Sequence, residues 1–101
     1  MLEKNLEQKL RKRIKAMGGK FYKWVSPGNN GVPDRIAIFP GGRIWFIEMK
    51  KEDGELSPLQ EFTLEELTGL GCNTAVIYTE AEMEVFLNDK IGYARLPKLH
   101  G

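Results

Sequence analysis

The segment DRIAIFPGGRIWFIEMK, at residues 34–50, predicts the central part of the fold. Two runs rich in β-branched and aromatic residues flank a Pro-Gly-Gly tripeptide, which predicts a β-hairpin with a three-residue loop. Residues equally distant from Gly41 then face each other across the hairpin. This register pairs Phe39 with Arg43, Ile38 with Ile44 and Ile36 with Phe46. It also places the carboxylates of Asp34 and Glu48 side by side.

These two acids and one lysine form a candidate catalytic group. Successive strand residues alternate between faces, so Glu48 and Lys50 point the same way, and Asp34 joins them across the hairpin. Two adjacent carboxylates repel each other unless a cation compensates, and Mg²⁺ or Mn²⁺ suits oxygen ligands. Such an ion could activate water against a phosphodiester while Lys50 stabilises developing negative charge.

An ordinary ion pair between Glu48 and Lys50 is the structural alternative, because these residue types are common on protein surfaces. Three features favour a functional site. The acids lie in an otherwise apolar hairpin, and the predicted register pairs them. A glycine-containing loop rich in turn-forming residues (residues 26–31) precedes Asp34.

The remaining elements follow from periodicity and capping patterns. Apolar residues at helical spacing before Gly18-Gly19 predict the first helix, and Ser57 and Thr79 each begin a capping box. The predicted elements are a helix over residues 3–17, a strand near residues 21–25, the hairpin, a helix from Ser57 to about Leu70, a strand over 74–78 and a helix through about Asn88. The expected order is αβββαβα.

A chain of 101 residues with 42% hydrophobic residues predicts a single domain. Its core is expected at about residues 3–88, with a weakly specified tail at 91–101. The single Cys72 excludes an internal disulfide and is expected to be a small core residue. No apolar run approaches the roughly 20 residues needed to cross a bilayer, so we expect a cytoplasmic protein without membrane contact.

Charge is distributed unevenly along the chain. The first 23 residues hold eight basic and two acidic side chains, although the net charge is only +1. A basic segment of this kind favours nucleic acid as partner, although a solvated helix face is an equally good explanation. The candidate contacts with nucleic acid are Lys9, Arg13, Lys20, Lys23, Asn30 and Arg35. For Arg35, a structural ion pair is equally expected, because it should point away from Asp34. Trp24 and Trp45 are expected in the core rather than as platforms on which bases stack.

The motifs resemble those of a known nuclease family. Gly31-Val32-Pro33-Asp34-Arg35, followed fourteen residues after Asp34 by Glu48-Met49-Lys50, resembles the PD-(D/E)xK nuclease motif. The closer similarity is to the VRR-NUC family, whose members share a first-helix glutamate, a Gly-Gly hairpin and a Ser-Pro-x-Gln helix start. This resemblance covers residues 3 to about 87.

The resemblance implies a restriction-endonuclease-like α/β core in which a mixed sheet with a central hairpin is flanked by helices. It implies Asp34, Glu48 and the Met49 carbonyl as metal ligands, Lys50 as the catalytic amine, and Gln60 as an accessory active-site residue that also completes a capping box. It further implies a helix acid that is also a metal ligand, either Glu3 or Glu7. We prefer Glu7, which lies nearer the helix middle.

The leading hypothesis is a Mg²⁺- or Mn²⁺-dependent endonuclease acting on DNA in a bacterial or phage-infected cell. Family similarity implies a preference for branched DNA, such as four-way (Holliday) junctions, and a homodimer. Two alternatives remain at this point. One is a nucleic-acid-binding module without catalysis, and the other is a metal-binding α/β domain that serves a structural role.

Overall fold

Helix α1 spans Glu3–Ala16 in the computed structural model, which describes residues 2–92. Leu6, Leu10 and Ile14 are buried along one side of this helix, as their spacing predicts. The helix ends before Gly18, whose φ of 84° is readily adopted by glycine. The first helix is therefore confirmed to within one residue of its predicted end.

A mixed four-stranded sheet forms the centre of the molecule. Its strands are β1 (Lys20–Lys23), β2 (Arg35–Phe39), β3 (Arg43–Met49) and β4 (Asn73–Ile77), in the spatial order β1-β2-β3-β4. Strand β2 is antiparallel to both β1 and β3, and β4 runs parallel to β3. Each predicted hairpin pair from Ile36 and Phe46 to Phe39 and Arg43 is present, so the predicted register is confirmed.

Two capped helices follow the hairpin. Helix α2 spans Pro58–Gly69 and helix α3 spans Glu80–Val85, and each begins with a complete capping box. The chain then continues as a π-helix, η1, over Phe86–Gly92. The third helical segment thus extends beyond the predicted end at Asn88. Ile91 is 0% exposed rather than part of a weak tail, because its side chain joins the core.

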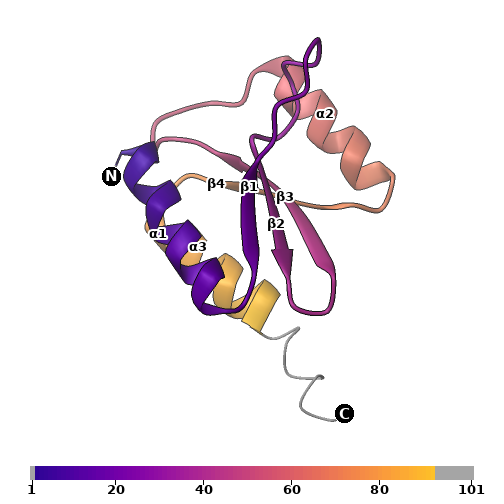
Figure 1. Ribbon diagram of the computed structural model, residues 1–101. Helices are drawn as coiled ribbons and strands as arrows, with labels where there is room; N and C mark the ends of the chain where they lie inside the picture. Colours follow the sequence, from indigo (N-terminus) through magenta and orange to yellow (C-terminus); the bar gives the residue numbers. More distant parts are fainter. Residues whose placement is uncertain (1, 93–101) are drawn as a thin grey trace.

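The two faces of the sheet are covered unequally. Helices α1 and α3 lie together on one side, and α2 lies on the other (Figure 1). The main hydrophobic core lies between the sheet and the helices α1 and α3. On the α2 side, Tyr22 is 52% exposed and Ile44 is 43% exposed, so part of that face remains open.

Three further expectations concern Cys72, a membrane-spanning helix and the C-terminal tail. Cys72 is free and half-buried rather than a core residue, because it lies in the turn that leads from α2 into β4. Within residues 2–92, no helix combines the length and the apolar character needed to cross a membrane. The predicted tail beyond Gly92, including His100, lies outside the described residues.

The loop between β1 and β2 packs tightly against α2. A Cβ atom at Gly31 would lie 2.6 Å from the Thr63 hydroxyl oxygen and 2.7 Å from the Leu59 carbonyl oxygen. Any larger residue at this position must push the loop away from the helix, and the backbone carbonyl leaves little room for adjustment. Glycine is therefore required here by close approach rather than by a turn.

Replacement Gly31→Ala should lower the free energy of unfolding by about 1 to 3 kcal/mol, because the added methyl group meets backbone as well as side chain. Gly69→Ala is a matched control in α2, since nothing lies within 4 Å of its added Cβ. It should be neutral or stabilising by up to about 1 kcal/mol. Urea denaturation measures both. Equal stability of the two variants would contradict the tight packing.

Candidate functional site

The hairpin ends bring Asp34, Glu48 and Lys50 together. Asp34 directly precedes β2, and the register that pairs Arg35 with Ile47 places it beside Glu48 one step further along. The Met49 backbone N–H donates a hydrogen bond of 3.1 Å to the Asp34 carboxylate. The Lys50 ammonium nitrogen lies 3.8 Å from Glu48 Oε2. The predicted group of two acids and an amine is thus present in space.

Burial makes this carboxylate pair electrostatically unfavourable. Glu48 is only 4% exposed. Burial, followed by the nearby charge of Asp34, raises the pKa of Glu48 to about 7, although Lys50 opposes the rise. Burial also raises the pKa of Asp34, against the opposing effects of the Met49 N–H and of Arg35. Additional positive charge at this position would relieve both acids.

Gln60 links the start of α2 to this site. Its side-chain oxygen accepts a hydrogen bond of 2.9 Å from the Ser57 N–H, which completes the capping box. Its side-chain nitrogen donates to Glu48 Oε2 at 3.3 Å. One amide therefore completes the predicted capping box and also contacts the buried carboxylate of Glu48.

The two acids of α1 have different surroundings. Glu7 forms a two-pronged ion pair with Arg35, whose Nη2 lies 2.6 Å from Oε2 and whose Nε lies 3.1 Å from Oε1. This hydrogen bonding lowers the pKa of Glu7. In contrast, the negative charge of the exposed Glu3 contributes to raising the pKa of both Asp34 and Glu48. These contacts do not support the preference for Glu7 over Glu3.

Three of the predicted nucleic-acid contacts are engaged in ion pairs. Lys9 pairs with Glu80 at 3.0 Å, Arg13 pairs with Glu84, and Arg35 pairs with Glu7. Sequence reasoning could not identify these partners, because two of them come from α3, at the other end of the chain. The structure leaves Lys20, Lys23 and Asn30 exposed.

A pocket of about 330 Å³ opens beside the carboxylates. Its lining residues come from the loop, the hairpin and α2, and they are Trp24, Val25, Ser26, Asn29, Asn30, Val32, Asp34, Glu48 and Gln60. Trp24 was expected in the core, but it forms one wall of this pocket, and its ring packs against Phe46 at 5.2 Å between centroids. The one indication of this placement in the sequence was that Trp24 lies just before the turn-rich loop at residues 26–31.

The site offers a small number of oxygen atoms that could bind a metal ion. Among residues 2–92, no three His, Cys, Asp or Glu side chains gather closely enough to hold one together. The available ligands are therefore the Asp34 and Glu48 carboxylates, supplemented by backbone oxygen. Hard oxygen donors whose pKa values are raised mainly by burial fit Mg²⁺ or Mn²⁺, which commonly bind one or two carboxylates and retain water.

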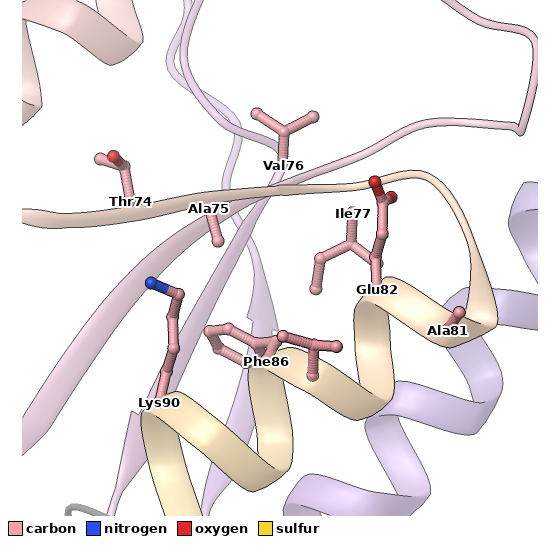
Figure 2. A pocket seen from close by; sticks show the side chains of 9 residues that line it. Thr74, Ala75, Val76, Ile77, Ala81, Glu82, Phe86 and Lys90 are labelled. Carbon is pink, nitrogen blue, oxygen red and sulfur yellow. The ribbon is translucent and has the colours of Figure 1, made fainter.

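A second cavity, of about 380 Å³, lies between β4 and the helices α3 and η1. Figure 2 shows Ala75 and Ile77 of β4 directed toward Phe86. Its charged lining residues are Glu82 and Lys90, and Glu82 already accepts hydrogen bonds as the cap of α3. This cavity therefore lacks the paired acids that distinguish the site at the hairpin ends.

The raised pKa of Glu48 has a consequence for stability in the presence of a chelator. Its folded-state pKa of about 7 exceeds the ordinary value of 4.5, so the unfolding free energy should fall as pH rises between these values. Replacement Glu48→Gln should remove this dependence and stabilise the protein by about 2 kcal/mol near pH 8. Thermal unfolding across this pH range measures the effect.

Glu52→Gln, in an exposed loop, is the matched control and should leave the pH profile unchanged. A Glu48→Gln variant with the original pH dependence would show that the buried carboxylate is not its source.

Comparisons with known proteins agree with this geometry. The VRR-NUC domain model matches residues 1–81. The chain is 37% identical over 75 residues to "Putative nuclease p44" of Acyrthosiphon pisum secondary endosymbiont phage 1, covering 74% of this chain and 81% of that protein. A solved structure described as a VRR-NUC domain aligns with a TM-score of 0.81 at 29% identity, covering 85% of this chain and 94% of the other. This chain therefore belongs to the VRR-NUC family, and its mixed α/β core is a nuclease domain whose substrate is nucleic acid.

Proposed function

We propose that this nuclease domain is a metal-dependent endonuclease that hydrolyses DNA phosphodiester bonds. The observation that carries the proposal is the pairing of the buried Glu48 with the half-buried Asp34, with Lys50 beside Glu48. A protein that only binds nucleic acid gains nothing from two carboxylates, which repel phosphate unless a cation is present.

Asp34, Glu48 and the Met49 carbonyl would hold the Mg²⁺ or Mn²⁺ ion. When bound, such an ion neutralises charge on the scissile phosphate and lowers the pKa of a water molecule. The protein keeps the carboxylates ready by two contacts. The Met49 N–H holds Asp34, and the Gln60 amide holds Glu48.

Lys50 is the proposed catalytic amine. Hydrolysis forms a bond between a water oxygen and phosphorus and breaks one bridging phosphorus–oxygen bond. Negative charge therefore accumulates on the phosphate oxygens and on the leaving oxygen. The Lys50 ammonium, 19% exposed and near Glu48, is placed to stabilise that charge or to position the attacking water.

Of the two acids of α1, Glu3 is proposed to act on the site, through its charge rather than as one of the metal ligands. Its charge acts on both carboxylates, and it is exposed, whereas Glu7 is held by Arg35. The DNA backbone would approach over β1 and the loop, where Lys20, Lys23 and Asn30 are exposed. Cationic and amide side chains at the rim favour phosphate contacts without reading sequence.

Branched DNA, such as a four-way junction, is the proposed substrate, and a homodimer is the proposed functional form. Both finer proposals rest on the resemblance to the family. The dimer gains physical support from the open face of the sheet, where Tyr22 and Ile44 are exposed. A two-fold dimer supplies the two active sites that symmetric cleavage of two strands requires.

Cleavage of labelled linear duplex, flap and four-way-junction DNA tests the activity, with Mg²⁺, Mn²⁺ or EDTA. Asp34→Asn and Lys50→Ala should each lower the cleavage rate by about 100-fold or more, because each removes a group that acts on the reacting phosphate. EDTA should abolish cleavage.

Two neighbouring residues provide matched controls. Lys51 and Asp53 have side chains that are 65% and 85% exposed and lie just beyond the site. Lys51→Ala and Asp53→Asn should stay within about threefold of the unmodified rate, as surface substitutions usually do. If all the variants bound DNA equally and none cleaved any substrate, the protein would be a non-catalytic binding module rather than an enzyme.

The proposed dimer has a separate test in sedimentation velocity. Ile44→Glu places a charge on the open sheet face and should weaken self-association by about tenfold or more. Val85→Glu is the control, because Val85 is 52% exposed, compared with 43% for Ile44, but belongs to α3, on the other side of the sheet. A monomeric unmodified protein, or equal effects of both variants, would refute this interface.

A further inference from the structure

Trp24 lies in line with the two acids across the sheet. Its backbone N–H donates a hydrogen bond of 2.9 Å to the Asp34 carbonyl oxygen, one step beyond the last listed strand pair of β1 and β2. The register of β2 and β3 in turn places Asp34 beside Glu48. Residues opposed in neighbouring strands direct their side chains to the same face of a sheet. The Trp24 ring is therefore on the same face as both carboxylates.

A second aromatic ring supports Trp24. Phe46 precedes Glu48 by two positions on β3, so these two side chains also share a face. The Phe46 and Trp24 ring centroids are 5.2 Å apart, with an angle of 44° between the ring planes. Trp24 is only half-buried, so part of its ring remains accessible. An exposed ring that is already held in place loses little conformational entropy when a flat ligand stacks on it.

The pocket beside Trp24 has the size and the lining of a site for one flat, polar-edged ligand. Its volume of about 330 Å³ is near the lower limit of about 300 Å³ for small-molecule sites, which suits a single nucleobase. Val25 and Val32 add apolar surface to the pocket. Ser26 and Asn29 add a hydroxyl and an amide, which are joined by a hydrogen bond of 3.1 Å. Such groups can bond to the polar edge of a base.

The position of the pocket fixes which base could enter it. Asp34 and Glu48 line the same pocket, and in the proposed reaction they hold the cation at the scissile phosphate. A base beside them belongs to a nucleotide that adjoins this phosphate. A base within a duplex must leave its stack before it can present a face to Trp24, and this requires less free energy for an unpaired base.

We propose that this pocket receives one unpaired nucleobase next to the scissile phosphate, with Trp24 as the surface on which the base stacks. The inference rests on the proposed nuclease function. It narrows the substrate class to DNA that is cut beside an unpaired or easily unpaired nucleotide, as at a flap or a branch point. Stacking uses the face that all four bases possess, so the pocket selects DNA structure more than sequence.

The test combines changes in the protein with changes in the DNA. After the cut has been mapped in the best-cleaved substrate, an abasic residue replaces each adjoining nucleotide in turn. At one position it should lower kcat/KM of the unmodified protein by about tenfold, because a stacked base is lost. Trp24→Leu should lower kcat/KM by a similar factor, and the abasic residue should then cause less than about a twofold further loss.

Two further variants separate stacking from folding. Trp24→Phe keeps an aromatic face and should keep the sensitivity to the abasic residue. Phe62→Leu is the matched control, because Phe62 is a 57% exposed aromatic residue of α2 outside the pocket lining, and it should behave as the unmodified protein does. If Trp24 only packs on Phe46, Trp24→Leu slows the cleavage of every substrate equally and the tenfold abasic effect remains. That result, or the absence of any abasic effect, would overturn the inference.

Tryptophan fluorescence gives a readout that does not depend on cleavage. It is measured in the Asp34→Asn variant with EDTA, since this variant has one charge fewer to repel phosphate. A single-stranded oligonucleotide should quench the fluorescence more strongly than a duplex of the same sequence, and adding Trp24→Phe should remove this difference. Equal quenching by the two DNAs would overturn the inference. If the unmodified protein cleaves no substrate, the proposed nuclease function fails, and the fluorescence still decides whether the pocket takes a base.

Discussion

At the open end of the hairpin, the buried carboxylate of Glu48 lies beside the half-buried carboxylate of Asp34, and the neighbouring elements are arranged around this pair. Glu48 is 4% exposed beside Asp34, and its pKa is raised to about 7. An apolar hairpin would be more stable with neutral residues at these positions. Closely spaced, partly buried carboxylates are common in active sites. The negative potential that destabilises the metal-free protein also favours the binding of a cation.

Each neighbouring element contributes one contact that keeps this arrangement in place. Helix α2 supplies Gln60, whose amide caps the helix and also holds Glu48. Helix α1 supplies Glu7, which reaches Asp34 through Arg35. The loop before Asp34 packs on α2 through Gly31, where no side chain fits. Assembly of the site and packing of the fold therefore depend on the same contacts.

Local rules predicted much of the fold and the centre of the site. The hairpin register followed from Gly41 and strand alternation, and both capping boxes followed from residue types three positions apart. Predictions were poorer where distant segments meet. Ile91 was expected in a weak tail and is fully buried, since the helix continues as η1 to join the core. Trp24 was expected in the core and forms a wall of the site pocket.

The opposition of Asp34 and Glu48 could be predicted from the local sequence, because pairing within a hairpin depends only on residues close in the chain. The ion-pair partners of the charged side chains of α1, in contrast, depend on tertiary structure. Lys9 and Arg13 pair with glutamates 71 residues away, and Glu7 with an arginine 28 residues away. Such pairs depend on how helices pack against the sheet, and similar charges along a helix carry no local indication of their partners. The surroundings of Glu3 and Glu7 likewise depend on the folded molecule, in which Glu7 meets Arg35.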